Sequence, residues 1–163
     1  LAMSLDGISV LNDLAGGVTV TLEDDFSAAD PAMTKGATLT LQGDQAEIFV
    51  RRRMDIGEGT NEARMVRQEE YLAQLSAQLE SRVQQDQQFT AQVYDALQPY
   101  LVTDLAKGQL VNEVWAAKDD TVEPAIALEG EHKVAEDGFT EFYPTEASVQ
   151  KAVLTLFWEP VEE

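Results

Sequence analysis

The chain is organised around one stretch, Arg51-Arg-Arg-Met-Asp-Ile-Gly-Glu-Gly-Thr-Asn-Glu-Ala-Arg-Met-Val-Arg-Gln68. This arginine segment contains five of the six arginines of the protein and three acidic residues, whereas the whole chain carries 11 Lys and Arg against 30 Asp and Glu. Two like charges 4 Å apart repel each other by about 1 kcal/mol in water. A positive cluster in so acidic a chain therefore needs either carboxylates of the fold or a bound anion to offset the repulsion.

The spacing of the first three arginines favours an anion site. If residues 50–53 are extended, side chains alternate between two faces, so that Arg51 and Arg53 share one face and Arg52 points away. A guanidinium group donates two parallel hydrogen bonds to an oxyanion. Two such groups on one face suit a phosphate or a pyrophosphate.

The second half of the segment predicts the start of a long helix. A turn with two glycines precedes Thr60 and Asn61, and either residue is a good N-cap. Arg64, Arg67 and Gln68 then lie on one helical face, at positions i, i+3 and i+4. Arginine near a helix N-terminus opposes the helix dipole, and an anion held by the free N–H groups there relieves that cost.

Two interpretations of the cluster stay open on the sequence alone. In the first, the arginines bind a phosphate-containing ligand. In the second, they bind nothing, because nearby carboxylates neutralise them. The candidates for that pairing are Asp24, Asp25, Glu62, Glu69 and Glu70.

Composition narrows the functional classes. A chain of 163 residues with 44% hydrophobic content predicts one folded domain. Its net charge of −19 excludes nucleic acid as the main partner, because the phosphate backbone would be repelled. The lack of cysteine excludes disulfides and thiolate metal sites. His132 is expected at the surface, and the acids at 23–25 are expected to be a solvated strand end rather than a cation site, so no metal site is predicted for this chain.

The order of elements predicts an α/β protein. Apolar periodicity predicts a helix over residues 4–15, ended by the glycine pair that follows it. Alternating β-branched residues predict strands at 18–22 and 38–41. A short helix from Asp44 then leads into the arginine segment.

The long helix is expected over residues 61–85. Its buried stripe is predicted to consist of Met65, Leu72, Leu75, Leu79 and Val83. A helix ending at Pro99 follows, and then a helical segment capped by Thr103-Asp104, which is interrupted or turned at Gly108 and resumes through Leu110, Val114 and Trp115.

The last 40 residues change in character after a boundary loop at 119–124. A strand is predicted at 125–128, a hairpin-like loop at 129–138 and a second strand at 139–143. A helix is predicted from Thr145 onward. No internal repeat or linker is evident, which favours one domain.

Three segments together resemble the LytR–CpsA–Psr (LCP) family of bacterial cell-envelope proteins. They are Leu5-Asp-Gly-Ile-Ser-Val-Leu-Asn-Asp-Leu-Ala-Gly-Gly-Val-Thr-Val20, Gly43-Asp-Gln-Ala-Glu-Ile-Phe-Val-Arg-Arg-Arg53 and Asn61-Glu-Ala-Arg-Met-Val-Arg-Gln68. They match the family's Gly-Gly-Val strand, its Gly-x-Gln-Ala helix leading to Arg-x-Arg, and its Arg-x-x-Arg-Gln helix start. The resemblance implies an α/β/α sandwich with a mixed sheet and several helices. The chain, 1–163, would be a single domain, with the C-terminal part of the catalytic domain at about 1–120 and a strand-helix extension at about 121–163.

The resemblance also implies a function, that of a phosphotransferase of cell-wall biogenesis. Such enzymes move a glycopolymer, for example wall teichoic acid or capsule, from a polyprenyl-pyrophosphate carrier to peptidoglycan. They face outward on the cytoplasmic membrane, anchored by an N-terminal transmembrane helix. An older label for the family, transcriptional attenuator, finds no support in an acidic chain without a DNA-reading motif. By position, the pyrophosphate-binding residues would be Arg51, Arg53, Arg64, Arg67 and Gln68, and no catalytic residue is identified.

One departure from the family pattern bears on activity. The family's Mg²⁺-binding carboxylates and further arginines would precede Leu1, and the chain starts without an initiator methionine, so we expect a fragment of a longer enzyme that is inactive alone. A sheet edge left exposed could pair two copies as a homodimer. The alternative is a non-catalytic cell-envelope module whose arginines dock an acidic partner or polymer.

Overall fold

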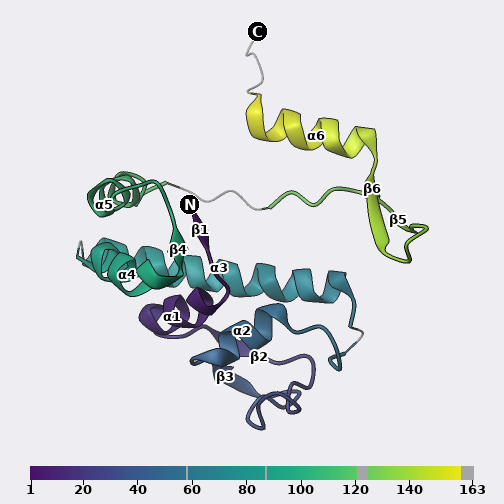
Figure 1. Ribbon diagram of the computed structural model, residues 1–163, viewed down its shortest axis with the longest axis horizontal. Helices are drawn as coiled ribbons and strands as arrows, with labels where there is room; N and C mark the ends of the chain where they lie inside the picture. The colour runs from purple at the N-terminus through teal and green to yellow at the C-terminus, as the bar shows by residue number, and fades with distance from the viewer. Residues whose placement is uncertain (58, 87, 121–124, 159–163) are drawn as a thin grey trace. The chain divides into compact units, whose positions relative to one another are not determined.

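The computed structural model describes residues 1–57, 59–86, 88–120 and 125–158. The chain forms two compact units, Leu1–Asp120 and Thr121–Glu163 (Figure 1). The predicted α/β class is confirmed. The strands of the described residues pair as three separate antiparallel ribbons of two strands each, rather than as one mixed sheet. The prediction of a single domain stays a prediction.

The first unit is built on one long helix, α3, which is contacted by α1, α2 and α4 (Figure 1). Its elements in chain order are β1 (Ala2–Met3), α1 (Asp6–Ala15), β2 (Thr19–Thr21), β3 (Thr38–Thr40), α2 (Asp44–Arg51), α3 (Asn61–Gln85), α4 (Phe89–Leu97), the 3-10 turn η1 (Gln98–Tyr100), β4 (Leu101–Val102) and α5 (Lys107–Ala116). The predicted span of α3 is confirmed, and Oγ1 of Thr60 caps it by accepting a hydrogen bond from the Ala63 N–H.

The glycine pair predicted to end α1 does so in the left-handed region. Gly16 has a φ of 101°, and its N–H donates to carbonyls of the last turn of α1. Gly17 has a φ of 84°, and a Cβ built on it would lie 2.7 Å from the carbonyl oxygen of Leu41. The pair therefore turns the chain and lets it enter β2 close against the end of β3.

A buried asparagine ties these elements to α3. Asn12 is fully buried, and its Nδ2 donates to the Leu41 carbonyl at 2.8 Å. Its Oδ1 accepts from the Val18 N–H at 3.1 Å and from the Tyr71 hydroxyl at 3.3 Å. Burial raises the pKa of Tyr71 to about 12, because a phenolate would be poorly solvated there. Asn12 thus joins α1, the two strand ends and α3 with its polar groups satisfied.

The core lies where the β2–β3 ribbon meets α1, α2 and the middle of α3. It consists of buried apolar side chains from these elements, from the loop between the two strands and from the turn between α2 and α3. Its members are Ala15, Val18, Val20, Leu22, Phe26, Met33, Leu41, Ala46, Phe49, Val50, Ile56, Tyr71 and Leu75.

The predicted buried stripe of α3 is half right. Leu75 and Val83 are buried, but Met65 and Leu72 are 50% and 56% exposed. The N-terminal half of the helix turns a different face inward, on which Tyr71 is buried and polar side chains bond to α2. Apolar periodicity selected the wrong face there, because the inward positions near α2 are taken by hydrogen-bond donors.

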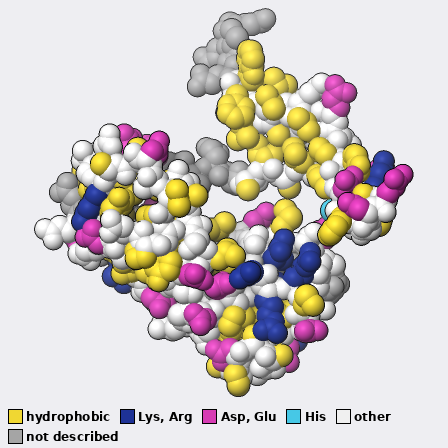
Figure 2. Space-filling model, in the orientation of Figure 1, with side chains coloured by type: hydrophobic (Ala, Val, Ile, Leu, Met, Phe, Trp, Pro, Cys, Tyr) yellow, Lys and Arg dark blue, Asp and Glu magenta, His cyan; other side chains and the backbone are white. Residues whose placement is uncertain are grey.

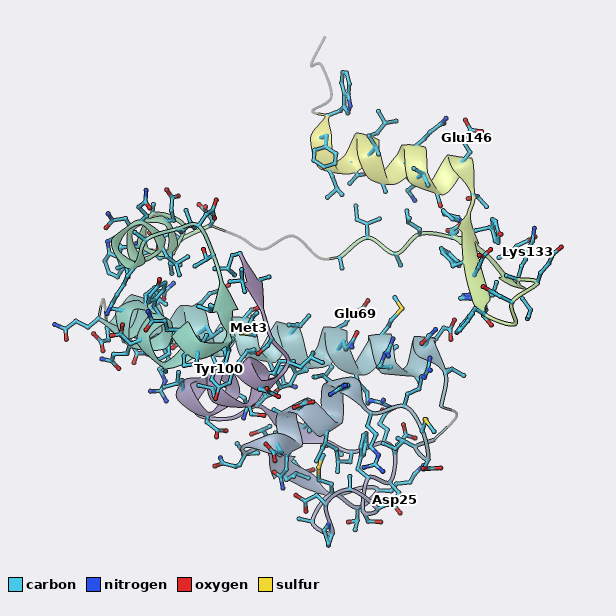
Figure 3. The ribbon with its side chains drawn as sticks, viewed as in Figure 1. Met3, Asp25, Glu69, Tyr100, Lys133 and Glu146 are labelled. Carbon is cyan, nitrogen blue, oxygen red and sulfur yellow. The ribbon has the colours of Figure 1, made fainter. Side chains whose placement is uncertain are left out.

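The N-terminus pairs with the segment that follows α4. In the β1–β4 ribbon Ala2 lies opposite Val102 and Met3 opposite Leu101. The Ser4 N–H extends the pairing by donating to the Tyr100 carbonyl at 2.8 Å. Figure 3 labels Met3 and Tyr100 at this junction.

Helix α5 differs from its prediction. It begins after Ala106, whose N–H donates to Oε1 of Gln109 at 3.0 Å, and it continues to Ala116. The predicted interruption at Gly108 is wrong. Gly108 lies in the first turn, where the backbone N–H groups have no partner within the helix, so the helix tolerates a glycine there.

The second unit is a hairpin followed by a helix. Strand β5 (Gly130–Val134) pairs with β6 (Thr140–Pro144), and α6 (Glu146–Phe157) is capped by Oγ1 of Thr145. The predicted strand at 125–128 is wrong. Strand β5 begins only at Gly130, within the segment that was predicted to be a loop, and it pairs with β6. The second predicted strand and the helix are confirmed.

Most apolar side chains of this second unit are exposed. Among its described residues only Ala152 is buried, whereas Phe139 and Trp158 are 73% and 69% exposed. Figure 2 shows hydrophobic side chains gathered over α6. None of the residues at 125–158 covers them.

Candidate anion-binding site

The first two arginines do not follow the predicted alternation. Arg51 is the last residue of α2, and only from Arg52 is the backbone extended. Arg51 and Arg53 therefore leave different kinds of backbone instead of one strand face. Arg52, which was predicted to point away, is among the residues that line the depression described next.

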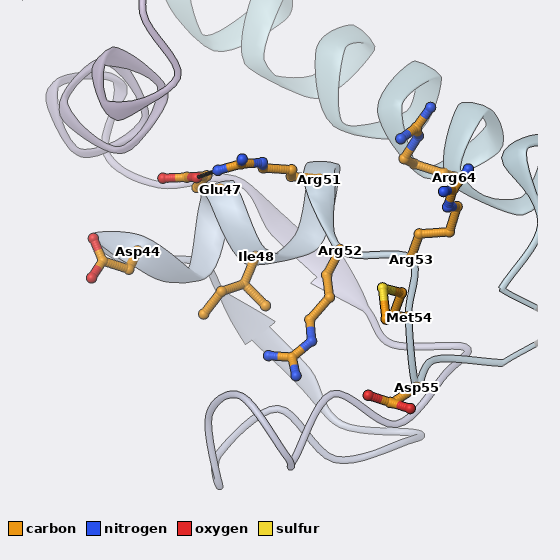
Figure 4. A pocket seen from close by; sticks show the side chains of 9 residues that line it. All are labelled: Asp44, Glu47, Ile48, Arg51, Arg52, Arg53, Met54, Asp55 and Arg64. Carbon is orange, nitrogen blue, oxygen red and sulfur yellow. Dashed lines mark hydrogen bonds and ion pairs between the residues drawn. The ribbon is translucent and has the colours of Figure 1, made fainter.

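The end of α2 and the start of α3 enclose an open depression of about 860 Å³ (Figure 4). We call it the arginine depression. It is lined by Asp44, Glu47, Ile48, Arg51, Arg52, Arg53, Met54, Asp55 and Arg64. Four arginines against three carboxylates make its lining net positive, in a chain whose net charge is −19. Figure 2 shows Lys and Arg side chains grouped on the visible face of the molecule.

Two of the lining arginines converge on one neutral oxygen. Nη1 of Arg53 and Nη2 of Arg64 donate to Oδ1 of Asn61, at 2.8 and 3.3 Å. Nε of Arg64 is buried and has no hydrogen-bond partner among the described residues. An unsatisfied buried N–H is costly unless something accepts from it. Together these donors are arranged as they would be around an oxyanion.

The third lining arginine from the prediction has an internal partner. Nη1 of Arg51 donates to Oε1 of Glu47 at 2.7 Å, one turn back along α2 (Figure 4). The Arg51 side chain is 61% exposed and that of Glu47 only 22%. An exposed i, i+4 pair contributes about 0.3–0.5 kcal/mol, so it is readily exchanged.

Arg67 lies below the depression instead of lining it. Its side chain is 11% exposed and donates to the carbonyls of Phe49 at 3.2 Å and Arg52 at 2.5 Å. It also donates to the Asp24 carboxylate at 3.3 Å and lies over the Phe26 ring, 5.2 Å from its centroid. Burial lowers the pKa of Arg67, and the charge of Asp24 opposes that shift. The guanidinium group is thus held inside the fold.

Gln68, like Arg67, donates to the backbone near the end of α2. Its Nε2 donates to the Val50 carbonyl at 2.9 Å. The last carbonyls of a helix have no partner within the helix. Arg67 and Gln68 supply partners at the end of α2 and just beyond, so they fix the backbone that carries Arg51 and Arg53.

The turn after Arg53 packs against the same carboxylate. Gly57 has a φ of 48°, and a Cβ built on it would lie 2.3 Å from Oδ1 of Asp24. Asp24 therefore touches both Arg67 and the turn. The pairing interpretation is correct for Asp24 and Arg67. Asp25 instead accepts from the Ser27 N–H, and this hydrogen bond lowers its pKa.

Sequence reasoning missed Glu47 and Asn61 as arginine partners. Both signals were present, since Glu47 lies four residues before Arg51 and Asn61 three residues before Arg64. The convergence of Arg53 on Asn61 had no such signal, because it depends on the course of the turn between them.

In the described part of the chain, no group of three or more His, Cys, Asp or Glu side chains is placed to hold a metal ion. No helix among the described residues has both the length and the apolar character to cross a membrane.

The chain matches one family model and is similar to several solved structures. The model of the LytR_cpsA_psr family matches residues 1–156. Among solved structures, protein gbs0355 from Streptococcus agalactiae is similar with a TM-score of 0.71 and 19% identity, over 94% of this chain and 55% of that chain. A transcriptional regulator, EF0465, from Enterococcus faecalis has a TM-score of 0.70 and 18% identity, over 94% and 56%. TagV from B. subtilis has a TM-score of 0.63 and 16% identity, over 97% and 63%.

At such identities the likenesses show a shared fold, and this chain spans about 55–63% of the length of the three solved chains. No curated protein matched the sequence.

Proposed function

The chain belongs to the LytR–CpsA–Psr family of the cell envelope, and from this we propose that it is the pyrophosphate-holding part of a cell-wall glycopolymer transferase. Its ligand would be a polyprenyl-pyrophosphate-linked glycan, and the acceptor peptidoglycan. Wall teichoic acid and capsule are the polymers to test first. The whole enzyme would act on the outer face of the cytoplasmic membrane, anchored by an N-terminal helix.

One observation supports this proposal most strongly. Arg53 and Arg64 point their donors at a single neutral oxygen, and the buried Nε of Arg64 lacks a partner among the described residues. A phosphate oxygen in this position would accept charge-assisted hydrogen bonds, which are stronger than those to an amide. Arg51 lines the same depression, and we propose that it would bind the second phosphate.

Such an arrangement suits transfer of a phosphate-linked glycan. An acceptor hydroxyl would form a new P–O bond as it loses its proton, and the bond to the bridging oxygen of the pyrophosphate would break. Polyprenyl phosphate would leave with the additional negative charge. Arginines aimed at that charge lower the barrier, because phosphoryl transfer depends on positioning and neutralisation.

The five predicted site residues divide into two roles in this proposal. Arg51, Arg53 and Arg64 would contact the pyrophosphate. The contacts of Arg67 and Gln68 favour a positioning role, since backbone carbonyls and Asp24 already accept from them.

We further propose that this chain binds the ligand without transferring it. The family implies Mg²⁺, and we propose that carboxylates that precede this segment in the whole enzyme hold it. When bound, the ion would neutralise phosphate charge. A turnover assay with Mg²⁺ and polyprenyl-pyrophosphate substrate checks this expectation, and product formation by residues 1–163 alone would refute it.

Calorimetry with a short-chain polyprenyl pyrophosphate tests the binding proposal. Arg53→Ala and Arg64→Ala should each weaken binding about tenfold or more, given about 1.5–3 kcal/mol for a hydrogen bond to a charged group. Lys35→Ala is the matched control, because Lys35 is an exposed cation outside the depression. Equal binding by all variants would contradict the proposal. Arginine-dependent binding to polyglutamate but not to pyrophosphate would favour the docking-module alternative.

A further inference from the structure

The Arg51–Glu47 pair gives the arginine depression an internal competitor for its ligand. Glu47 is the less exposed partner, so its carboxylate is the fixed end of the pair. The Arg51 side chain folds back along α2 to reach it. Figure 4 shows this guanidinium group beside Glu47, away from Arg53 and Arg64. A ligand that uses all three arginines must therefore displace a carboxylate from Arg51.

We propose that Glu47 is a specificity-determining residue, which competes with the second phosphate of a pyrophosphate for Arg51 and so limits how strongly the depression prefers pyrophosphate over a monophosphate. This inference rests on the proposed function. A single phosphate placed at Arg53 and Arg64 gains hydrogen bonds there without disturbing Glu47. A pyrophosphate is longer and more highly charged, so that its second phosphate can replace the Glu47 carboxylate at Arg51.

Glu47 also acts on both ligands through its charge. A nearby carboxylate repels an anion in proportion to the anion's charge. Removing that charge should therefore help pyrophosphate more than phosphate. The exchange at Arg51 adds to this difference, because only the longer ligand takes part in it.

Calorimetry with inorganic phosphate and inorganic pyrophosphate provides the test. Glu47→Gln keeps the shape of the side chain and removes its charge. We expect pyrophosphate affinity to rise about threefold to tenfold and phosphate affinity to change less than about twofold. The melting temperature should stay close to that of the wild type, because an exposed i, i+4 pair contributes little.

The matched control is Asp44→Asn. Asp44 also lines the depression, and this variant removes the same charge without touching Arg51. An equal gain in Asp44→Asn would reduce the effect to net charge and overturn the inference. So would a Glu47→Gln variant that leaves the pyrophosphate affinity unchanged.

A double-mutant cycle with Arg51→Ala separates exchange from repulsion. The gain from Glu47→Gln should fall by at least about half when Arg51 is already absent, because no pair remains to be exchanged. An undiminished gain would refute the role of Arg51. If pyrophosphate binding depends on Arg53 and Arg64 but its affinity is the same in Glu47→Gln as in the wild type, only this inference fails. If it does not bind pyrophosphate, the proposed function fails with it.

Discussion

The arginine segment has an inner side, whose side chains bond within the fold, and an outer side, whose side chains line the depression. On the inner side, Arg67 and Gln68 donate hydrogen bonds to carbonyls at the end of α2 and just beyond it, and Arg67 also donates to Asp24. On the outer side, Arg53 and Arg64 share one amide oxygen, and the exposed Arg51 side chain holds the Glu47 carboxylate. The comparison teaches that a cluster of arginines is not one site. Its inner members determine stability, and its outer members remain exchangeable.

The largest expected effect is on the inner side. Arg67→Ala would leave carbonyls and the Asp24 carboxylate without their donor in a nearly dry environment. We expect the free energy of unfolding to fall by about 3 kcal/mol. Urea unfolding measures it, with Arg51→Ala as the control, which should stay within about 0.5 kcal/mol of the wild type. Similar losses in the two variants would erase the distinction.

Tyr71 extends the inner side along α3 and predicts a pH dependence. Its pKa is raised to about 12 in the fold, against 10.0 for the ordinary group. The neutral phenol is favoured, so its contribution is full below pH 10 and is lost as pH rises from 10 through about 12. The loss should approach about 2 kcal/mol. Tyr71→Phe should remove this part of the alkaline slope in urea titrations, and an unchanged slope would contradict the assignment.

A smaller stability effect is expected at Gln68. Gln68→Met preserves length and removes the donor to the Val50 carbonyl. We expect a loss of about 1 kcal/mol in unfolding free energy. Affinity for pyrophosphate should fall slightly as the end of α2 loosens. A loss of affinity as large as that in Arg64→Ala would instead assign Gln68 to direct contact with the ligand.

The smallest stability effects are expected on the outer side. Asn61→Ala removes the shared acceptor, and Thr60 keeps the helix cap. We expect a change of less than about 0.5 kcal/mol in thermal unfolding. A large loss would show that Asn61 supports the fold, as Arg67 does.

Much of the fold could be predicted because its signals are local. The bounds of α3, its Thr60 cap and the glycine end of α1 depend on neighbouring residues. The strand at β2 follows from alternating β-branched residues. These features need no knowledge of the tertiary structure.

The missed features depend on partners that are distant in sequence. Met65 and Leu72 are exposed because the inward face of α3 near α2 is occupied by donors to carbonyls. The same contacts separate Arg67 from the other arginines. Helical spacing placed Arg64 and Arg67 on one face, but it could not tell which guanidinium group would be buried under the end of α2.

The glycine at position 57 gives the turn a mechanical link to the inner side. Any larger residue would press on the Asp24 carboxylate, which lies where its Cβ would be. That carboxylate would have to shift, and the salt bridge to Arg67 would shift with it. A substitution at Gly57 would thus first disturb the guanidinium group of Arg67, ten positions further along the chain. The absence of one methyl group allows the inner and outer arginines to occupy their places at the same time.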